Sequence, residues 1–306
     1  MAFSELIAIY LFLGGSAAGA FALMSIADLW IAFCCARDRR RHIPNRYSAG
    51  PAAIAWHRIA RLVYGASFVM MMAALLCLLA DLGRPEAFYL LFTNPSGSLM
   101  SLGTFALTLL SLCMAAVLAW EGLTLGSGWR RVARVAQGVG IAFALVVMVY
   151  TGMLLQTAVA VPLWQSSWLW VLFLFSSLSC GCAVIMLCTC ASEGYQRIAL
   201  IRRRALGLDA VFILLEAAST AAFILTVGAD GSVHPLQALA AGGFAALFWL
   251  GFIGCGILIP LAIEILLLIG CRHPGGTAAA TLAVLVLAGG LCLRLVMIGA
   301  GVTPAI

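Results

Sequence analysis

The sequence predicts an all-α integral membrane protein, a bundle of about eight transmembrane helices with both termini outside the cytoplasm (N-out/C-out). Of its 306 residues, 64% are hydrophobic and 9% are charged, whereas a soluble domain has about 25% charged residues. The hydrophobic residues fall in blocks of about 18 or more, each long enough to cross a hydrocarbon core of about 30 Å. Because these blocks are continuously apolar instead of alternating, they predict helices and not the strands of a barrel.

The blocks define eight expected spans, and little of the chain remains for a separate soluble domain. The spans are Leu6–Ala36, Leu62–Ala80, Leu99–Leu123, Val132–Thr157, Trp168–Ala191, Ala205–Val227, Leu239–Ile269 and Ala278–Val302. We therefore expect a single transmembrane helical domain over residues 1–306, with a possible division into two four-helix halves, 1–160 and 161–306.

The distribution of arginine predicts the orientation. The chain has no Lys, and the Arg residues of its connections lie at 37–61, 130–134, 197–204 and 272, all in odd-numbered connections. The even-numbered connections hold only Arg84. By the positive-inside rule the odd connections are cytoplasmic, which places both termini outside.

The net charge of +6 is explained by the membrane and does not indicate a nucleic-acid partner. Arginine beside a span sets topology and contacts anionic lipid headgroups. Residues 1–10 lack a basic region and carry Glu5 as their only charge. The first block is therefore expected to be an uncleaved span and not a signal peptide.

The sequence predicts no metal, haem or iron–sulfur cluster in this chain. The four histidines, at 42, 57, 234 and 273, lie in connections or at span ends, whereas a membrane haem b needs imidazoles within the spans. The 11 cysteines contain no CxxC or ferredoxin-type run. The pairs Cys180/Cys182 and Cys188/Cys190 are interpreted as small packing residues.

Charged residues inside the spans are the first candidates for function, because each costs at least about 2.5–3.5 kcal/mol in the bilayer. Glu216 lies near the middle of the sixth span and Arg294 lies in the outer half of the eighth. A structural ion pair between them and a role in proton movement or ligand binding both remain open. Glu264 and Asp28 lie near cytoplasmic span ends, where solvation or a nearby Arg is the simpler explanation.

The second connection has the most structured outer sequence. Asp81 is placed to pair with Arg84, Gly83 and Pro85 favour a sharp turn, and Asn94 is placed to open the third helix. A tight hairpin explains these residues. A docking surface for a partner protein on the outer face would need the same rigid turn chemistry.

An ordered set of motifs resembles the NrfD/polysulfide reductase membrane-subunit family. The motifs lie at 11–20, 81–85, 94–96, 100–101, 150–152, 161–164 and 289–294, so they run from the first span to the last. The anchor subunits of dimethyl sulfoxide reductases share the architecture. The resemblance implies a multi-pass protein of the bacterial cytoplasmic (inner) membrane.

The resemblance also implies a role within a larger enzyme. Such subunits anchor an outward-facing iron–sulfur (ferredoxin-like) subunit, usually with a molybdopterin catalytic subunit beyond it. They pass electrons between an exchangeable quinone, such as menaquinol, and the nearest cluster. The resemblance therefore implies that the chain is a quinone-interacting subunit of an anaerobic respiratory oxidoreductase and that it is not catalytic by itself.

A quinone pocket needs an apolar slot, hydrogen-bonding groups at the ring oxygens and a path for protons. Gly14, Gly15, Tyr150, Gln156 and Arg294 are expected to contact the quinone, because all lie in the outer halves of their spans. For the glycines, close helix packing is the competing interpretation, and for Tyr150 it is an aromatic-belt position.

The remaining assignments are proton transfer and docking. Glu216 is the candidate for proton transfer, and the docking surface comprises Asp81, Arg84, Pro85 and Asn94. Two other functions remain open at this point. A purely structural anchor would keep the docking turn without quinone chemistry, and a secondary transporter would show an inverted repeat, of which the sequence gives no clear sign.

Overall fold

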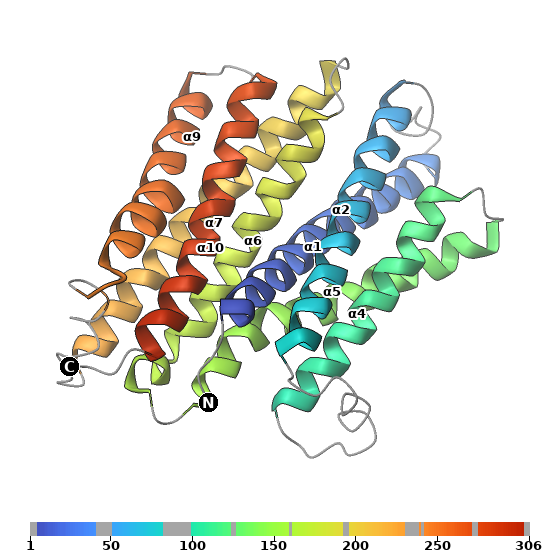
Figure 1. The fold of residues 1–306 in the computed structure, drawn as a ribbon. Coiled ribbons are helices and arrows are strands. Elements are labelled where there is room, and N and C mark those ends of the chain that lie inside the picture. The colour runs from blue at the N-terminus through green and yellow to red at the C-terminus, as the bar shows by residue number, and fades with distance from the viewer. Residues whose placement is uncertain are drawn as a thin grey trace.

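The protein is a bundle of eight long helices, which confirms the predicted fold class (Figure 1). The computed structural model describes residues 5–40, 51–81, 99–123, 127–158, 161–191, 196–229, 239, 242–270 and 275–302, and no strand occurs within these ranges. The helices are α1 (Glu5–Arg40), α2 (Pro51–Asp81), α4 (Leu99–Gly122), α5 (Ser127–Gln156), α6 (Trp168–Cys190), α7 (Gln196–Ala229), the π-helix η3 (Leu247–Leu258) that continues into α9 (Ile259–Ile269), and α10 (Gly276–Val302). A short 3-10 helix, η2 (Pro162–Gln165), connects α5 and α6.

The outer surface of the bundle is apolar, as a lipid-facing surface must be. Leu76, Leu225, Leu250 and Ile269 are each about two-thirds or more exposed. In water so many exposed large apolar side chains would be unfavourable, whereas in lipid they are solvated. All eight helices are long and apolar enough to cross a membrane.

Two helices begin earlier than the hydropathy predicts. Helix α2 begins at Pro51 and not near Leu62, and α7 begins at Gln196 and not near Ala205. The added turns carry arginines, which have high helix propensity and let a helix continue past the hydrocarbon into the headgroup region. The arginines predicted for cytoplasmic connections therefore lie partly on helical ends.

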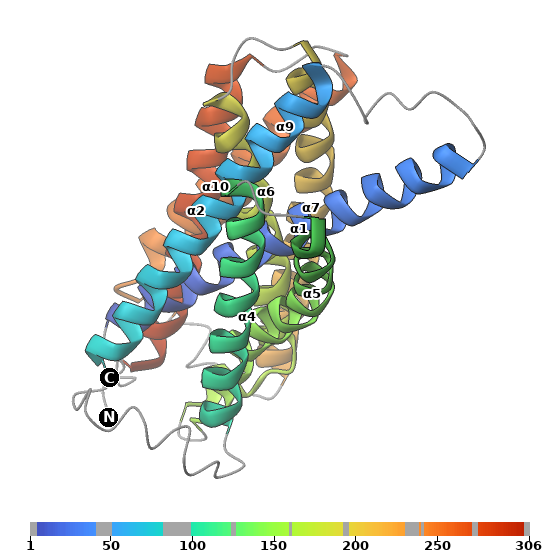
Figure 2. The same ribbon diagram turned by 90° about the vertical axis from the view of Figure 1, so that its right-hand side faces the viewer.

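Helix α1 lies at the centre of the bundle, and its last turns project beyond it (Figure 2). It contacts α2, α5, α6 and α10, so it packs against both the first four and the last four helices. Helix α1 begins and α10 ends at one end of the bundle, which we call the terminal face, and the other end is the opposite face (Figure 1). The orientation of these faces in the membrane remains a prediction.

Helices α1 and α6 cross with their backbones in contact. A Cβ atom on Gly19 would clash with the Ser177 carbonyl of α6, and a Cβ on Gly181 would clash with the backbone of Gly19. Small residues at a crossing let two helices approach and gain van der Waals contact, which stabilises helix pairs in lipid. A second such contact joins Gly256 of η3 to Gly289 of α10.

The seventh expected span, Leu239–Ile269, contains a π-helix before α9. Pro260 follows the π-helix and has no backbone N–H, and its ring prevents a normal α-helical contact with the preceding turn. The wider i→i+5 pattern of residues 247–258 accommodates this proline. Hydropathy alone predicts the span but not this local geometry.

Candidate functional site

Arg294 is fully buried near the terminal face, in a setting built by three helices. Its Nη1 donates to Ser176 Oγ at 2.5 Å and to the Gly290 carbonyl at 2.9 Å, and its Nη2 donates to Ser177 Oγ at 3.1 Å. The guanidinium lies over the ring of Phe173, 5.1 Å from its centroid. These contacts hold the side chain in one orientation, yet its Nε–H has no acceptor among the described residues.

The sequence left open a structural ion pair between Glu216 and Arg294, and the structure does not contain this pair. The carboxyl group lies close enough to Arg294 for their charges to interact, but it contacts the Ser176 hydroxyl instead. An ion pair does occur elsewhere in the described part of the chain, between His57 and Glu121 at 3.0 Å. Arg294, Ser176 and Glu216 therefore form a polar group that joins α10, α6 and α7.

Gly15 brings α1 against this group. A Cβ on Gly15 would clash with Ser177 Oγ and would lie 3.7 Å from Arg294 Nη2. Gly14 is placed differently, because a Cβ there would contact Ala74 of α2 at 3.8 Å. The structure thus brings Gly15 and Arg294 together, whereas Gly14 lies toward the first four helices.

Tyr150 lies beside Tyr10, a residue that hydropathy and motif spacing did not single out. The two hydroxyls face each other without hydrogen-bond geometry, and the Tyr10 hydroxyl is left with no partner among the described residues. The Tyr150 ring packs directly on Gly103 of α4, where a Cβ would clash with it. Since Tyr150 is 4% exposed, an aromatic belt facing lipid does not describe its position.

Gln156 lies at the end of α5 and holds the loop that follows. Its Nε2 donates to the Ser166 carbonyl at 2.8 Å. Trp164 of η2 is buried and donates from Nε1 to the Met297 carbonyl of α10 at 2.8 Å. The loop is thereby fixed against α5 and α10 at the terminal face, on the same side of the bundle as Arg294.

The predicted docking surface falls mainly outside the described residues. Asp81 is the last residue of α2, at the terminal face. Arg84, Pro85 and Asn94 lie outside the described residues, so their assignment stays a prediction.

Asp28 is partly exposed and forms no ion pair with an arginine among the described residues, but donors of the protein bind its carboxylate. It accepts hydrogen bonds from Trp56 Nε1 at 2.5 Å, from the Tyr64 hydroxyl at 2.6 Å and from Gln137 Nε2 at 3.2 Å. These donors come from α2 and α5, so the carboxylate ties three helices together near the opposite face. The carboxylate of Asp28 thus accepts its hydrogen bonds from within the protein, which favours a structural role.

Solvation does not explain Glu264, because this residue is 0% exposed and has no hydrogen-bond donor in the described part of the chain. It faces Asp209 of α7, which was not among the expected site residues. Asp209 lies inside the expected span Ala205–Val227. The high cost of a charge in lipid was a sufficient signal to single it out.

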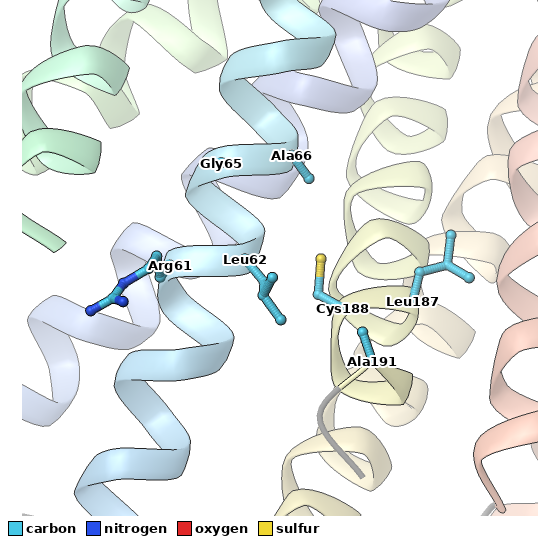
Figure 3. A pocket seen from close by; sticks show the side chains of 7 residues that line it. All are labelled: Arg61, Leu62, Gly65, Ala66, Leu187, Cys188 and Ala191. Atoms are coloured by element: carbon cyan, nitrogen blue, oxygen red, sulfur yellow. The ribbon is translucent and has the colours of Figure 1, made fainter. Parts of the chain in front are cut away.

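A groove of about 420 Å³ lies between α2 and α6 near the opposite face (Figure 3). Leu62, Ala66, Leu187 and Cys188 line it. Arg61 lies at its edge, and its Nε donates to the Glu121 carbonyl at 2.9 Å. The groove is therefore separate from the polar group around Arg294.

Comparison with known proteins identifies the family. The family model described as "Polysulphide reductase, NrfD" matches residues 1–305. The protein belongs to this family. It is 32% identical to the C subunit of polysulfide reductase from Wolinella succinogenes, over 97% of its own length and 93% of that protein. It is 29% identical to protein NrfD of Escherichia coli, over 84% of its own length and 82% of that protein.

Family membership and the eight apolar helices show a multi-pass membrane protein, consistent with the bacterial inner membrane. Within the described residues, no three His, Cys, Asp or Glu side chains come together in a way that would hold a metal ion. The buried polar groups around Arg294 are then the chemical feature that a function must explain.

Proposed function

We propose that the protein is the membrane anchor and quinone-interacting subunit of an outward-facing molybdopterin/iron–sulfur oxidoreductase. In this role it passes electrons between menaquinol and the iron–sulfur subunit. Its relationship to a polysulfide reductase subunit supports membership of a respiratory complex. The proposal assigns the quinone site to the polar group near the terminal face.

The observation that carries the proposal is a set of buried donors without acceptors. Arg294 Nε, Ser16 Oγ and the Tyr10 hydroxyl have no partner in the described part of the chain. A buried donor left unsatisfied costs about 1–3 kcal/mol, so such groups are retained where a ligand supplies the acceptor. The two oxygens of a quinone ring are acceptors of the required kind.

Quinol oxidation removes two electrons and two protons, and in the proposal different residues bind the ring and accept a proton. Arg294 donates a hydrogen bond to one ring oxygen, and its fixed orientation positions the ring. Tyr150, beside Tyr10, and the Gln156 side-chain oxygen serve the other oxygen. Glu216 accepts a proton through Ser176, whose hydroxyl contacts both Glu216 and Arg294.

In the proposal the glycines of α1 contribute their backbone to the quinone site. Gly15 lets α1 lie against the Arg294 group, where a Cβ would clash with Ser177 Oγ, and Gly14 lies beside it on the side that faces Ala74 of α2. A flat ring can lie against such a backbone, since no Cβ atom separates them. The electrons leave toward the terminal face, where Arg294 lies about 12 Å from the end of α10 at a rise of 1.5 Å per residue.

The proposed partners are the iron–sulfur subunit and, beyond it, the molybdopterin subunit. We assign the docking surface to the connection between α2 and α4, through Asp81, Arg84, Pro85 and Asn94. This connection leaves α2 at the terminal face, the same face as the Arg294 group. A cluster bound there would lie at the same face of the bundle as the proposed quinone site.

A redox assay on the purified complex in lipid nanodiscs tests the proposal. Wild-type complex should oxidise a menaquinol analogue, and Arg294→Gln should reduce this rate at least about tenfold, because a charged hydrogen bond to the ring contributes about 1.5–3 kcal/mol. Electrons from reduced benzyl viologen, given directly to the catalytic subunit, should be used at the wild-type rate.

Arg131→Gln, which removes an exposed arginine of α5, is the matched control and should leave both rates unchanged. Equal quinol oxidation by Arg294→Gln and wild type would show that the site is not at Arg294. Absence of quinol oxidation by the wild-type complex would favour a purely structural anchor.

A further inference from the structure

Two carboxyl groups, Asp209 of α7 and Glu264 of α9, meet inside the bundle away from the Arg294 group. Both residues are 0% exposed. Ser179 of α6 donates from Oγ to Asp209 Oδ1 at 2.6 Å. Glu264 lies about 8 Å from the end of α9 at 1.5 Å per residue, so the pair is in the half of the bundle nearer the opposite face.

The pair lacks the donors that two carboxylates would need. Asp209 Oδ2 and both Glu264 oxygens receive no hydrogen bond from an N–H or O–H group of the described residues. The two carboxyl groups nevertheless contact each other at hydrogen-bonding range. A hydrogen bond between two carboxyl groups requires a proton on one of them, because ionised carboxylates are acceptors only.

Among the described residues, no cationic side chain donates a hydrogen bond to Asp209 Oδ2 or to either Glu264 oxygen. Within the described residues, the ionisable groups that face the pair are Cys180 and Cys182 of α6 and Glu216 of α7. Two like charges in contact in a low-dielectric site cannot both remain ionised, and such pairs share one proton. A single proton between Asp209 and Glu264 supplies the missing donor and leaves the pair with one negative charge.

We propose that Asp209 and Glu264 form a proton-binding site within the membrane, in which the two carboxyl groups share one proton that exchanges with the opposite face. The proton is the ligand that the unpartnered oxygens require. Ser179 fixes Asp209 by donating to its Oδ1, and the other oxygen, Oδ2, is the one that lacks a donor.

The site is aligned with Glu216. Seven residues, close to two helical turns, separate Asp209 from Glu216, so both carboxyl groups lie on the same face of α7. On α6, Ser179 contacts Asp209 and Ser176 contacts Glu216. The pair is thereby positioned to exchange a proton with Glu216 during quinol chemistry. This extension depends on the proposed function, whereas the shared proton does not.

Infrared spectroscopy of the purified complex in lipid nanodiscs tests the shared proton directly. The spectrum of wild type minus that of the double variant Asp209→Asn, Glu264→Gln should contain one protonated carboxyl C=O band and one carboxylate band. Both bands should be present at pH 8, where exposed carboxyl groups are ionised, and the C=O band should shift to lower frequency in D2O. Glu121→Gln, at a span end, is the control and should leave the C=O band in place.

The single variants give a second measurement. The amide in Asp209→Asn or Glu264→Gln supplies a permanent N–H donor to the remaining carboxylate, so each variant should keep the wild-type thermal midpoint. Two carboxylate bands, or two C=O bands, would overturn the proposal. A C=O band that appears only when Na⁺ is removed would show a sodium site instead. Because no quinol is added, the infrared result stands or falls independently of quinol oxidation.

Discussion

The guanidinium of Arg294 and the hydroxyl of Ser176 meet at 2.5 Å across the interface of α10 and α6, and Glu216 of α7 contacts the same hydroxyl. Ser176 therefore lies between two residues that the sequence analysis considered as a direct ion pair. The arrangement keeps both charged groups near each other without neutralising either by contact. A hydroxyl that both donates and accepts is suited to pass a proton between a ligand and Glu216.

Ser176→Ala is expected to reduce kcat/KM for a menaquinol analogue about tenfold, because it removes a hydrogen bond to a charged group that contributes about 1.5–3 kcal/mol. Ser177→Ala is the matched comparison, since it removes a longer hydrogen bond, of 3.1 Å, that does not involve Glu216. Its effect should be smaller. Equal effects of the two variants would show that Ser176 only positions Arg294.

The helix crossing of α1 and α6 gives a prediction about stability. Gly181→Ala should lower the free energy of unfolding by about 1–3 kcal/mol, because the added methyl group forces two contacting backbones apart. Gly138→Ala on α5 is the control, since a Cβ there meets nothing within 4 Å. Thermal unfolding in detergent should show a lower midpoint for the first variant alone. A wild-type midpoint for Gly181→Ala would mean that the crossing is looser than described.

The number and approximate position of the helices could be predicted from the sequence because both depend on local composition. A block of apolar residues must span the bilayer wherever it packs. The starts of α2 and α7 could not be predicted this way, since arginine-rich turns are polar yet helical. The π-helix also escapes hydropathy, because hydropathy reports composition and not the geometry around Pro260 or the close contact of Gly256 with Gly289 of α10.

The site was only partly predictable, for a related reason. Arg294 and Glu216 stand out as charges within apolar spans, and the cost of burying them is a local property. Their common partner Ser176 does not stand out, because a serine in a span is ordinary and its role depends on which helix faces it. Asp209 and Glu264 become meaningful only as a pair, and their contact depends on the packing of α7 against α9.

The membrane orientation remains a prediction from the arginine distribution. A reporter fused after Ile306 should be extracytoplasmic, and one inserted within residues 37–46 should be cytoplasmic. Paired alkaline phosphatase and green fluorescent protein fusions measure both sites. The opposite pattern at both sites would place the Arg294 group on the cytoplasmic side and contradict an outward-facing complex.

The docking turn gives a prediction about assembly. Arg84→Ala or Asp81→Ala should release the iron–sulfur partner from membranes or reduce electron transfer to it, while the protein stays inserted. Co-purification of the partner and quinol-linked activity measure the effect. Asp38→Ala, in the predicted first cytoplasmic connection, is the control and should leave assembly intact. Full assembly and activity in both docking variants would mean that the turn serves only as a hairpin.

The double variant Arg294→Leu, Glu216→Leu separates a structural role of these charges from a functional one. If they served only to stabilise the bundle, a single replacement would cost about 1–3 kcal/mol or more by leaving buried polar groups unsatisfied, and the double replacement would restore stability and activity together. We expect instead that the double variant folds, keeps wild-type use of electrons from reduced benzyl viologen, and loses menaquinol oxidation. This expectation follows from Arg294 Nε, which has no acceptor in the described part of the chain and which a stability role alone does not explain. Normal quinol turnover by the double variant would contradict the assignment of both residues.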